Sequence, residues 1–74
     1  MAEQNWRARI VCDPDLLHGE PCVRGTRIPV SILVASLTDL RIEDLLREYP
    51  QLERADIDAA ILFAAESAQG TMVA

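Results

Sequence analysis

The spacing of the apolar residues changes at Pro29, and this change restricts the second part of the chain to helices. After Pro29, apolar residues recur three and four positions apart in three successive groups, which is the period of an amphipathic helix. The three groups are Val30, Leu33, Val34 and Leu37; Ile42, Leu45, Leu46 and Tyr49; and Ile57, Ala60, Ile61, Ala64 and Ala68. We expect Pro50 to break the second helix and Gly70 to end the third, which is the longest.

The residues before Pro29 favour short extended segments. Residues 8–12, ARIVC, alternate weakly and predict a strand that ends at the turn formers Asp13 and Pro14. Residues 21–28 predict two extended segments bent at Gly25. A β-element this small is not stable alone, and strand exchange with a second copy is one way to cover its edges.

The length of the chain predicts a single domain with a marginal core. Of its 74 residues, 8–28 form the expected β-element, 29–69 a three-helix region and 70–74 a tail that we expect to fray. A chain of this size buries about 60% of its unfolded surface, so we expect a partner subunit, most simply in a homodimer. The fold class expected is mostly α with a small N-terminal β-element.

Hydropathy predicts the location of the protein, and charge restricts what it can bind. No apolar run approaches the roughly 18 residues that span a bilayer, and the polar start lacks the apolar segment of a signal peptide, so a cytoplasmic protein is expected. The net charge is −5: residues 1–29 carry four arginines and four acids, whereas residues 30–74 carry three arginines and eight acids. Such a chain is a poor nonspecific binder of nucleic acid.

The stretch HGEPCVRGTRIPV, residues 18–30, is rich in turn formers and arginines. Gly25 is expected to adopt a positive φ, with the Thr26 hydroxyl closing the bend. Arg24 and Arg27 then project from the turn, where three uses are open. They can clamp phosphates, pair with acids of a partner, or pair with acids of this chain, namely Asp13, Asp15 or Glu20.

Several other residues are singled out by type and position. Turn chemistry gives structural roles to Gly19, Pro21 and Pro29, and the stop of the second helix gives them to Tyr49 and Pro50. Trp6 either folds over the core or serves as an interface anchor. Leu62 and Phe63 widen the apolar face of the third helix, which favours burial on two sides and contact with a dimer mate or partner, unless they are incidental surface residues.

The sequence gives no basis for a metal, a cofactor or catalysis. Cys12, His18 and Cys22 have a spacing that fits no standard zinc pattern, and free thiols are expected. One histidine and no Gly-rich phosphate loop leave no nucleophile and base pair, so neither an enzyme nor a small-molecule substrate is expected.

The segments GEPCVRGTRIPV and IEDLLREYPQLERADIDAAILFAA resemble the domain-of-unknown-function 433 family of small prokaryotic proteins. The first matches the pattern G-x-P-x-x-x-G-T-R-x-P-V, and the second contains E-Y-P-x-L. The resemblance covers about residues 9–67. It implies a β-element followed by a homeodomain-like helix-turn-helix of three helices, and an antitoxin often encoded beside a PIN-like ribonuclease toxin.

The chain departs from the family pattern at the helix starts and in charge. Asp39 is the one obvious cap for the second helix, and Glu53 is a poor N-cap for the third. The helix that would enter a DNA groove, residues 54–67, carries Arg54 against three acids. The function that the resemblance implies is an antitoxin that binds a PIN-like toxin and regulates its own expression by binding DNA. The residues expected to contact DNA or the partner are Arg24, Thr26, Arg27 and Arg54. The alternatives are a stand-alone transcriptional regulator and a protein-interaction module that does not touch DNA.

Overall fold

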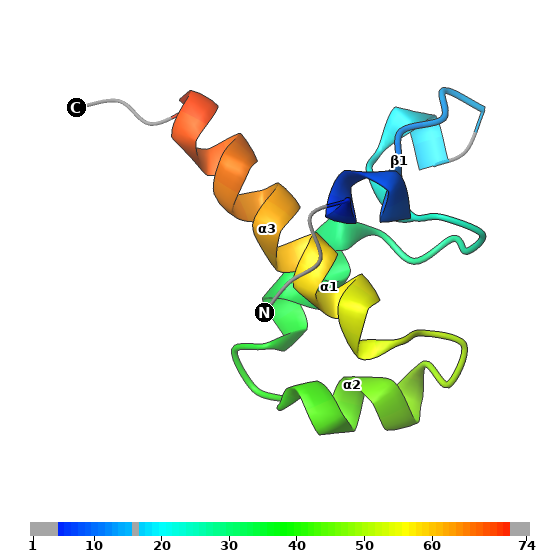
Figure 1. Cartoon of the computed structure of the whole chain (residues 1–74), viewed down its shortest axis with the longest axis vertical. Helices are drawn as coiled ribbons and strands as arrows, with labels where there is room; N and C mark the ends of the chain where they lie inside the picture. Colours follow the sequence, from blue (N-terminus) through cyan, green and yellow to red (C-terminus); the bar gives the residue numbers. More distant parts are fainter. Residues whose placement is uncertain (1–4, 16, 72–74) are drawn as a thin grey trace.

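A computed structural model of the chain describes residues 5–15 and 17–71. Its elements, in chain order, are the 3₁₀ helix η1 (Trp6–Arg9), strand β1 (Ile10–Val11), the 3₁₀ helix η2 (Leu17–Gly19), strand β2 (Cys22–Val23), and the helices α1 (Val30–Ser36), α2 (Ile42–Glu48) and α3 (Arg54–Thr71). Figure 1 shows α3 as the longest element, with its C-terminal end projecting beyond the others. The expected fold, three helices preceded by short strands, is confirmed. None of the described helices is long and apolar enough to cross a membrane.

The two strands form a short antiparallel ladder. Ile10 lies opposite Val23 and Val11 opposite Cys22, and Cys22 also bridges to Pro29, which brings the start of α1 back beside β2. The strand expected over residues 8–12 is shorter than predicted, because the chain up to Arg9 is coiled in η1. The amide of Ala8 donates to the carbonyl oxygen of Asn5 at 3.1 Å and closes that coil.

Residues 24–27, which we call the basic turn, follow β2 and form the bend expected at Gly25. Gly25 has a φ of +78°, a value that residues with a side chain rarely adopt. The Thr26 hydroxyl donates to the carbonyl oxygen of Val23 at 2.8 Å and accepts from the amide of Ile28 at 3.1 Å. The prediction that Thr26 closes the bend is confirmed, and both hydrogen bonds make the turn rigid.

One hydrophobic core joins the strand pair to all three helices. Its buried members are Ile10, Val23, Ile28, Val30, Leu33, Leu45, Leu52, Ile57, Ala59 and Ala60. Helix α3 packs against α1 and also against η1, so its wide apolar face is buried from two sides by this same chain. The small side chains of Ala59 and Ala60, both fully buried, let these elements approach closely.

At the start of two helices, an acid of the first turn, and not a residue before the helix, supplies the carboxylate that accepts a free backbone amide. The Asp44 carboxylate accepts the amide of Arg41 at 2.9 Å, and the Asp56 carboxylate accepts the amide of Glu53 at 2.8 Å. These carboxylates satisfy amides that the helix leaves free and lie at its positive end. The expectation that Asp39 caps the second helix is wrong, since α2 begins at Ile42 with Arg41 before it.

The helix ends follow the predictions in one case and not in the other. Helix α2 ends at Glu48, directly before Tyr49 and Pro50, and the half-buried Tyr49 ring packs against the core as expected. Gly70 does not end the third helix, because α3 runs to Thr71. Gly70 and Thr71 of the predicted tail therefore belong to α3, and the rest of that tail lies outside the described residues.

The stability of α2 is expected to depend on acid through Asp44. The hydrogen bond from the Arg41 amide, assisted by Arg47, holds the pKa of the Asp44 carboxyl below its usual range. Because the folded-state pKa is the lower one, the carboxylate stabilises the fold above the unfolded pKa, and this contribution is lost as the pH falls through the folded value. We expect wild type to be more stable than Asp44→Asn at neutral pH.

Urea unfolding of both proteins over a pH series tests this expectation. The difference in free energy of unfolding should be constant above about pH 5 and should shrink below about pH 4, where the carboxyl becomes a neutral acid. A difference that stays unchanged down to the acid unfolding limit would show that the charge of Asp44 contributes nothing.

Candidate partner-binding site

An apolar groove runs between the start of α1 and the outer half of α3. It has a volume of about 330 Å³ and is lined by Glu20, Pro21, Val30, Ser31, Phe63, Ala64, Ser67 and Ala68. The Ser31 hydroxyl donates to the Glu20 carboxylate at 2.7 Å, which places a hydrogen-bonded acid at the groove. Residues 65–69 of α3, which include two of the lining residues, are exposed. This end of the helix projects beyond the other elements (Figure 1).

The three residues predicted as interface anchors lie in different surroundings. Trp6 is half-buried against the core, with the Arg7 guanidinium 4.5 Å from its ring centre, so it folds over the core. Phe63 is half-buried, touches the core and lines the apolar groove. Leu62 is half-buried and does not line the groove. Of the three, Phe63 is the one that lines the apolar groove.

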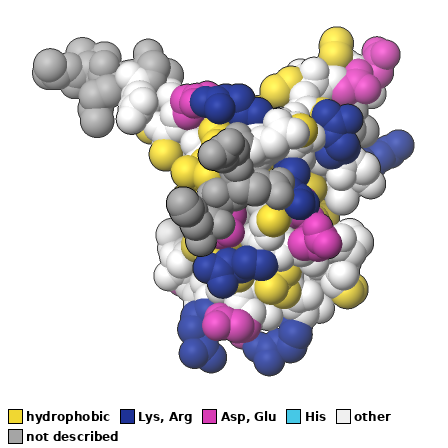
Figure 2. Space-filling view, in the orientation of Figure 1, with side chains coloured by type: hydrophobic (Ala, Val, Ile, Leu, Met, Phe, Trp, Pro, Cys, Tyr) yellow, Lys and Arg dark blue, Asp and Glu magenta, His cyan; other side chains and the backbone are white. Residues whose placement is uncertain are grey.

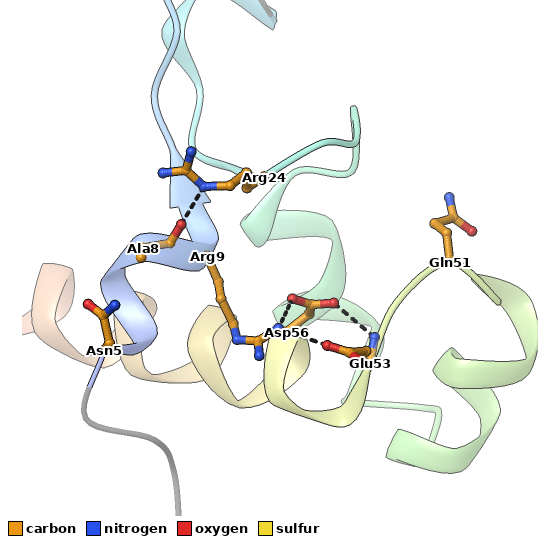
Figure 3. A pocket seen from close by; sticks show the side chains of 7 residues that line it. All are labelled: Asn5, Ala8, Arg9, Arg24, Gln51, Glu53 and Asp56. Atoms are coloured by element: carbon orange, nitrogen blue, oxygen red, sulfur yellow. Dashed lines mark hydrogen bonds and ion pairs between the residues drawn. The ribbon is translucent and has the colours of Figure 1, made fainter.

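Two hollows flank the basic turn, and Arg24 lines both. The first, of about 440 Å³, is lined by Asn5, Ala8, Arg9, Arg24, Gln51, Glu53 and Asp56 (Figure 3). The second, of about 520 Å³, is lined by Val11, Asp13, Arg24, Gly25, Thr26 and Arg27. In the space-filling view, positive side chains are spread over this face, from the region of the strand pair down to α2 (Figure 2). The structure thus brings Arg24, Thr26 and Arg27 together.

Arg54, the fourth predicted contact residue, lies elsewhere. It lines neither hollow and makes an ion pair of 3.4 Å with Asp58, one turn along α3. This pairing and the remaining acids of α3 leave the helix without a basic face, which is what a DNA groove would require.

A network around Asp56 was not predicted from the sequence. Arg9 donates to Asp56 at 2.9 Å and to Glu53 at 3.1 Å, and so ties the end of η1 to the first turn of α3 (Figure 3). Asp56 is 8% exposed and its second oxygen accepts the Glu53 amide. An acid at the third position of a helix is a usable signal for the cap. Nothing in the sequence identifies Arg9, which lies 47 positions away, as its partner.

The thiols and acids offer no metal centre among the described residues. Cys12 is exposed and Cys22 is buried, and both are free. Burial raises the pKa of the Cys22 thiol, with a smaller contribution from Glu20, and the thiol donates to the Glu20 carbonyl oxygen at 3.3 Å. No group of three histidine, cysteine or acidic side chains in residues 5–15 and 17–71 is placed to hold an ion.

The fold and these surfaces define a small, mostly helical protein in which a short strand pair is packed onto three helices. The chain belongs to the family described as "Protein of unknown function (DUF433)", whose model matches residues 10–64. The matched range contains both strands, the basic turn and most of α3.

A relative named "Uncharacterized protein y4eO", from Sinorhizobium fredii (strain NBRC 101917 / NGR234), is 37% identical over 59 residues. The similarity covers 78% of this chain but 27% of the relative, so the chain spans about a quarter of the length of that protein. No solved structure matches the chain.

Proposed function

We propose that the protein is an antitoxin that binds a PIN-like ribonuclease toxin with its apolar groove and the adjoining end of α3. The observation that carries the proposal is the length of α3 beyond the body. The helix has 18 residues, and five consecutive ones, residues 65–69, are exposed, two of them in the groove itself. An exposed helix end gains most of its stability from packing, so contact with a partner would stabilise it.

The chemistry of the groove fits a protein partner. Phe63 offers an aromatic edge, while Ala64 and Ala68 are small enough to let another backbone approach α3 closely. The class of partner is the one that the resemblance of this chain to the family implies. A stand-alone DNA-binding regulator has less support, because α3 carries one arginine and three acids and that arginine is paired with Asp58.

Co-expression with a PIN-like nuclease encoded beside this gene tests the proposal. We expect a purified complex with suppressed ribonuclease activity. Ala68→Arg places a charge in the apolar contact and should weaken binding by about thirtyfold or more, as for the loss of a central interface residue. Ala35→Arg is the matched control, because Ala35 is exposed on α1, does not line the groove and lies outside the exposed end of α3.

Two results would count against the proposal. Full nuclease activity in the presence of excess protein would remove the antitoxin role. Equal affinity of the Ala68→Arg and Ala35→Arg variants would leave the role standing but remove the groove from the interface.

A further inference from the structure

The basic turn differs from the rest of the surface in how its arginines are used. Four of the seven arginines pair with acids of this chain, in the ion pairs Arg7–Glu66, Arg9–Asp56, Arg47–Asp44 and Arg54–Asp58. Arg24 and Arg27 make no ion pair with any carboxylate in the described part of the chain, although acids outnumber arginines by 12 to 7. Although the protein has this excess of acid, these two neighbouring arginines lack a carboxylate partner in the described part of the chain. Their guanidinium groups therefore remain able to bind an anionic group of another molecule.

The acids that could have neutralised the turn have other roles. The Asp13 carboxylate accepts the amide of Asp15 at 2.9 Å, and Glu20 accepts the hydroxyl of Ser31. Asp13 lines the same hollow as Arg24 and Arg27 but does not pair with either. Pairing of these arginines with Asp13, Asp15 or Glu20, one of the three uses open from the sequence, is therefore not found in the part of the chain that the structure describes.

Arg24 is held in place for binding. Its Nε donates to the carbonyl oxygen of Ala8, and its own amide donates to the carbonyl oxygen of Arg9 at 2.7 Å. The side-chain bond uses one of the five donors of the guanidinium, and both terminal nitrogens point away from Ala8 with no hydrogen-bond partner among the described residues (Figure 3). A fixed fork of this kind loses little conformational entropy when it grips a planar oxyanion.

We propose that Arg24 and Arg27, set by the rigid turn at Gly25, bind carboxylates of an acidic loop on the partner protein. The identity of that partner as a nuclease toxin rests on the proposed function, whereas the chemistry of the site does not. Each guanidinium offers two parallel N–H groups to one carboxylate, and the hollow of about 520 Å³ beside the turn accepts the side chains.

Charge favours carboxylates over a nucleic-acid backbone as the ligand. A polyanion binds through many phosphates, each adding about 0.9 to the slope of log affinity against log salt, and this turn offers two cations. The net charge of −5 repels a long phosphate chain, and Asp13 at the edge of the hollow disfavours a doubly charged group. A short acidic protein segment meets fewer of these penalties.

Titration of the ¹⁵N-labelled full chain with a hexaglutamate peptide tests the site without any toxin. We expect the amides of Gly25 and Thr26 and the Nε–H signals of Arg24 and Arg27 to shift with a common, weak affinity. Arg27→Ala should weaken binding about five- to tenfold, and Arg27→Lys should recover part of it, because lysine keeps the charge without the fork. Hexathymidylate should bind the turn more weakly than the peptide.

Matched variants separate the site from general electrostatics and from folding. Arg54→Ala removes the same charge from a paired, exposed arginine and should leave peptide binding unchanged. Because Arg24 also bonds to Ala8, Arg24→Lys accompanies Arg24→Ala, with circular dichroism to verify the fold of each. Peptide affinity that is equal in wild type and Arg27→Ala would overturn the proposal, as would tighter binding of hexathymidylate at the turn.

The toxin complex distinguishes this proposal from the proposed function. If the nuclease binds wild type, Arg24→Lys and Arg27→Ala equally well, the arginine site is wrong and the antitoxin role stands. If the peptide binds at the turn and no nuclease is bound, the antitoxin role is wrong and the carboxylate site stands.

Discussion

Replacing Leu33 by alanine is expected to lower the free energy of unfolding by about 2 to 5 kcal/mol, the range for a leucine removed from a packed core. Leu33 is 0% exposed and lies on the side of α1 that belongs to the hydrophobic core. The lost methyl groups leave a cavity that neighbouring side chains fill only in part. Both the transfer of apolar surface from water and the packing contacts are then lost.

The effect is large relative to the whole stability of so small a chain. At about 0.05 to 0.15 kcal/mol per residue, 74 residues give a total of roughly 4 to 11 kcal/mol. Urea unfolding followed by circular dichroism measures the loss, and the melting temperature should fall by about 4 to 8 °C for each kcal/mol.

Ile32→Ala provides a matched control on the same helix. Ile32 is the next residue before Leu33, is 48% exposed, and loses the same number of carbon atoms on truncation to alanine. We expect its free energy of unfolding to change by less than about 0.5 kcal/mol. Similar losses in both variants would mean that α1 presents a different face to the core.

The contrast between Leu33 and Ile32 shows why the helices could be predicted from the sequence. The period of the apolar residues after Pro29 is a local property, and it places Val30, Leu33 and Leu45 on buried faces irrespective of the rest of the chain. Turn chemistry is local as well, so the positive φ of Gly25 and the role of Thr26 followed from residues two or three positions apart.

The features that sequence reasoning missed depend on contacts between distant parts of the chain. Residues 8 and 9 alternate weakly like a strand, but packing of Trp6 against the core coils them into η1. Gly70 is a frequent helix stop, yet α3 continues past it because one glycine costs only about 1 kcal/mol in a helix. Hydrogen bonds between residues close in sequence, such as those of Thr26, could be predicted. The ion pair of Arg9 with the distant Asp56 could not.

In the candidate site, too, the features set by neighbouring residues could be predicted and those set by distant contacts could not. Arg24, Thr26 and Arg27 are close in sequence, so their proximity on one turn was predictable. Whether the two arginines pair with acids of this chain depended on where Asp13 and Glu20 come to lie, and the structure gives both acids other partners. The apolar groove needed the placement of Pro21 against α3, which no local pattern encodes.

Replacing Asp56 by alanine is expected to destabilise the fold by about 2 to 4 kcal/mol, because one carboxylate serves two elements. One oxygen accepts from the Arg9 guanidinium at 2.9 Å and the other from the Glu53 amide at 2.8 Å. The side chain is 12% exposed, so water replaces it poorly. The loss should appear in urea unfolding at neutral pH.

Asp58→Ala is the matched control, two residues further along α3. Asp58 is 31% exposed and pairs with Arg54 at 3.4 Å within the helix surface, an arrangement that contributes less than about 1 kcal/mol. If Asp58→Ala lowers the free energy of unfolding as much as Asp56→Ala, the position of the acid in the network is irrelevant. The net charge of α3 would then determine the loss of stability.

Variants of Arg9 separate the two roles of Asp56. Arg9→Met keeps the hydrogen bond from the Glu53 amide to Asp56 but removes the ion pairs of Arg9 with Asp56 and Glu53. Asp56→Ala removes the amide bond and the Arg9–Asp56 ion pair. If the ion pair dominates, the two single variants lose similar free energy and the double variant loses little more. If the helix start dominates, Arg9→Met is mild and Asp56→Ala is severe. We expect the second outcome, in which Arg9→Met is mild. The Arg9 side chain is 27% exposed, so water reaches its ion pair with Asp56 and weakens it.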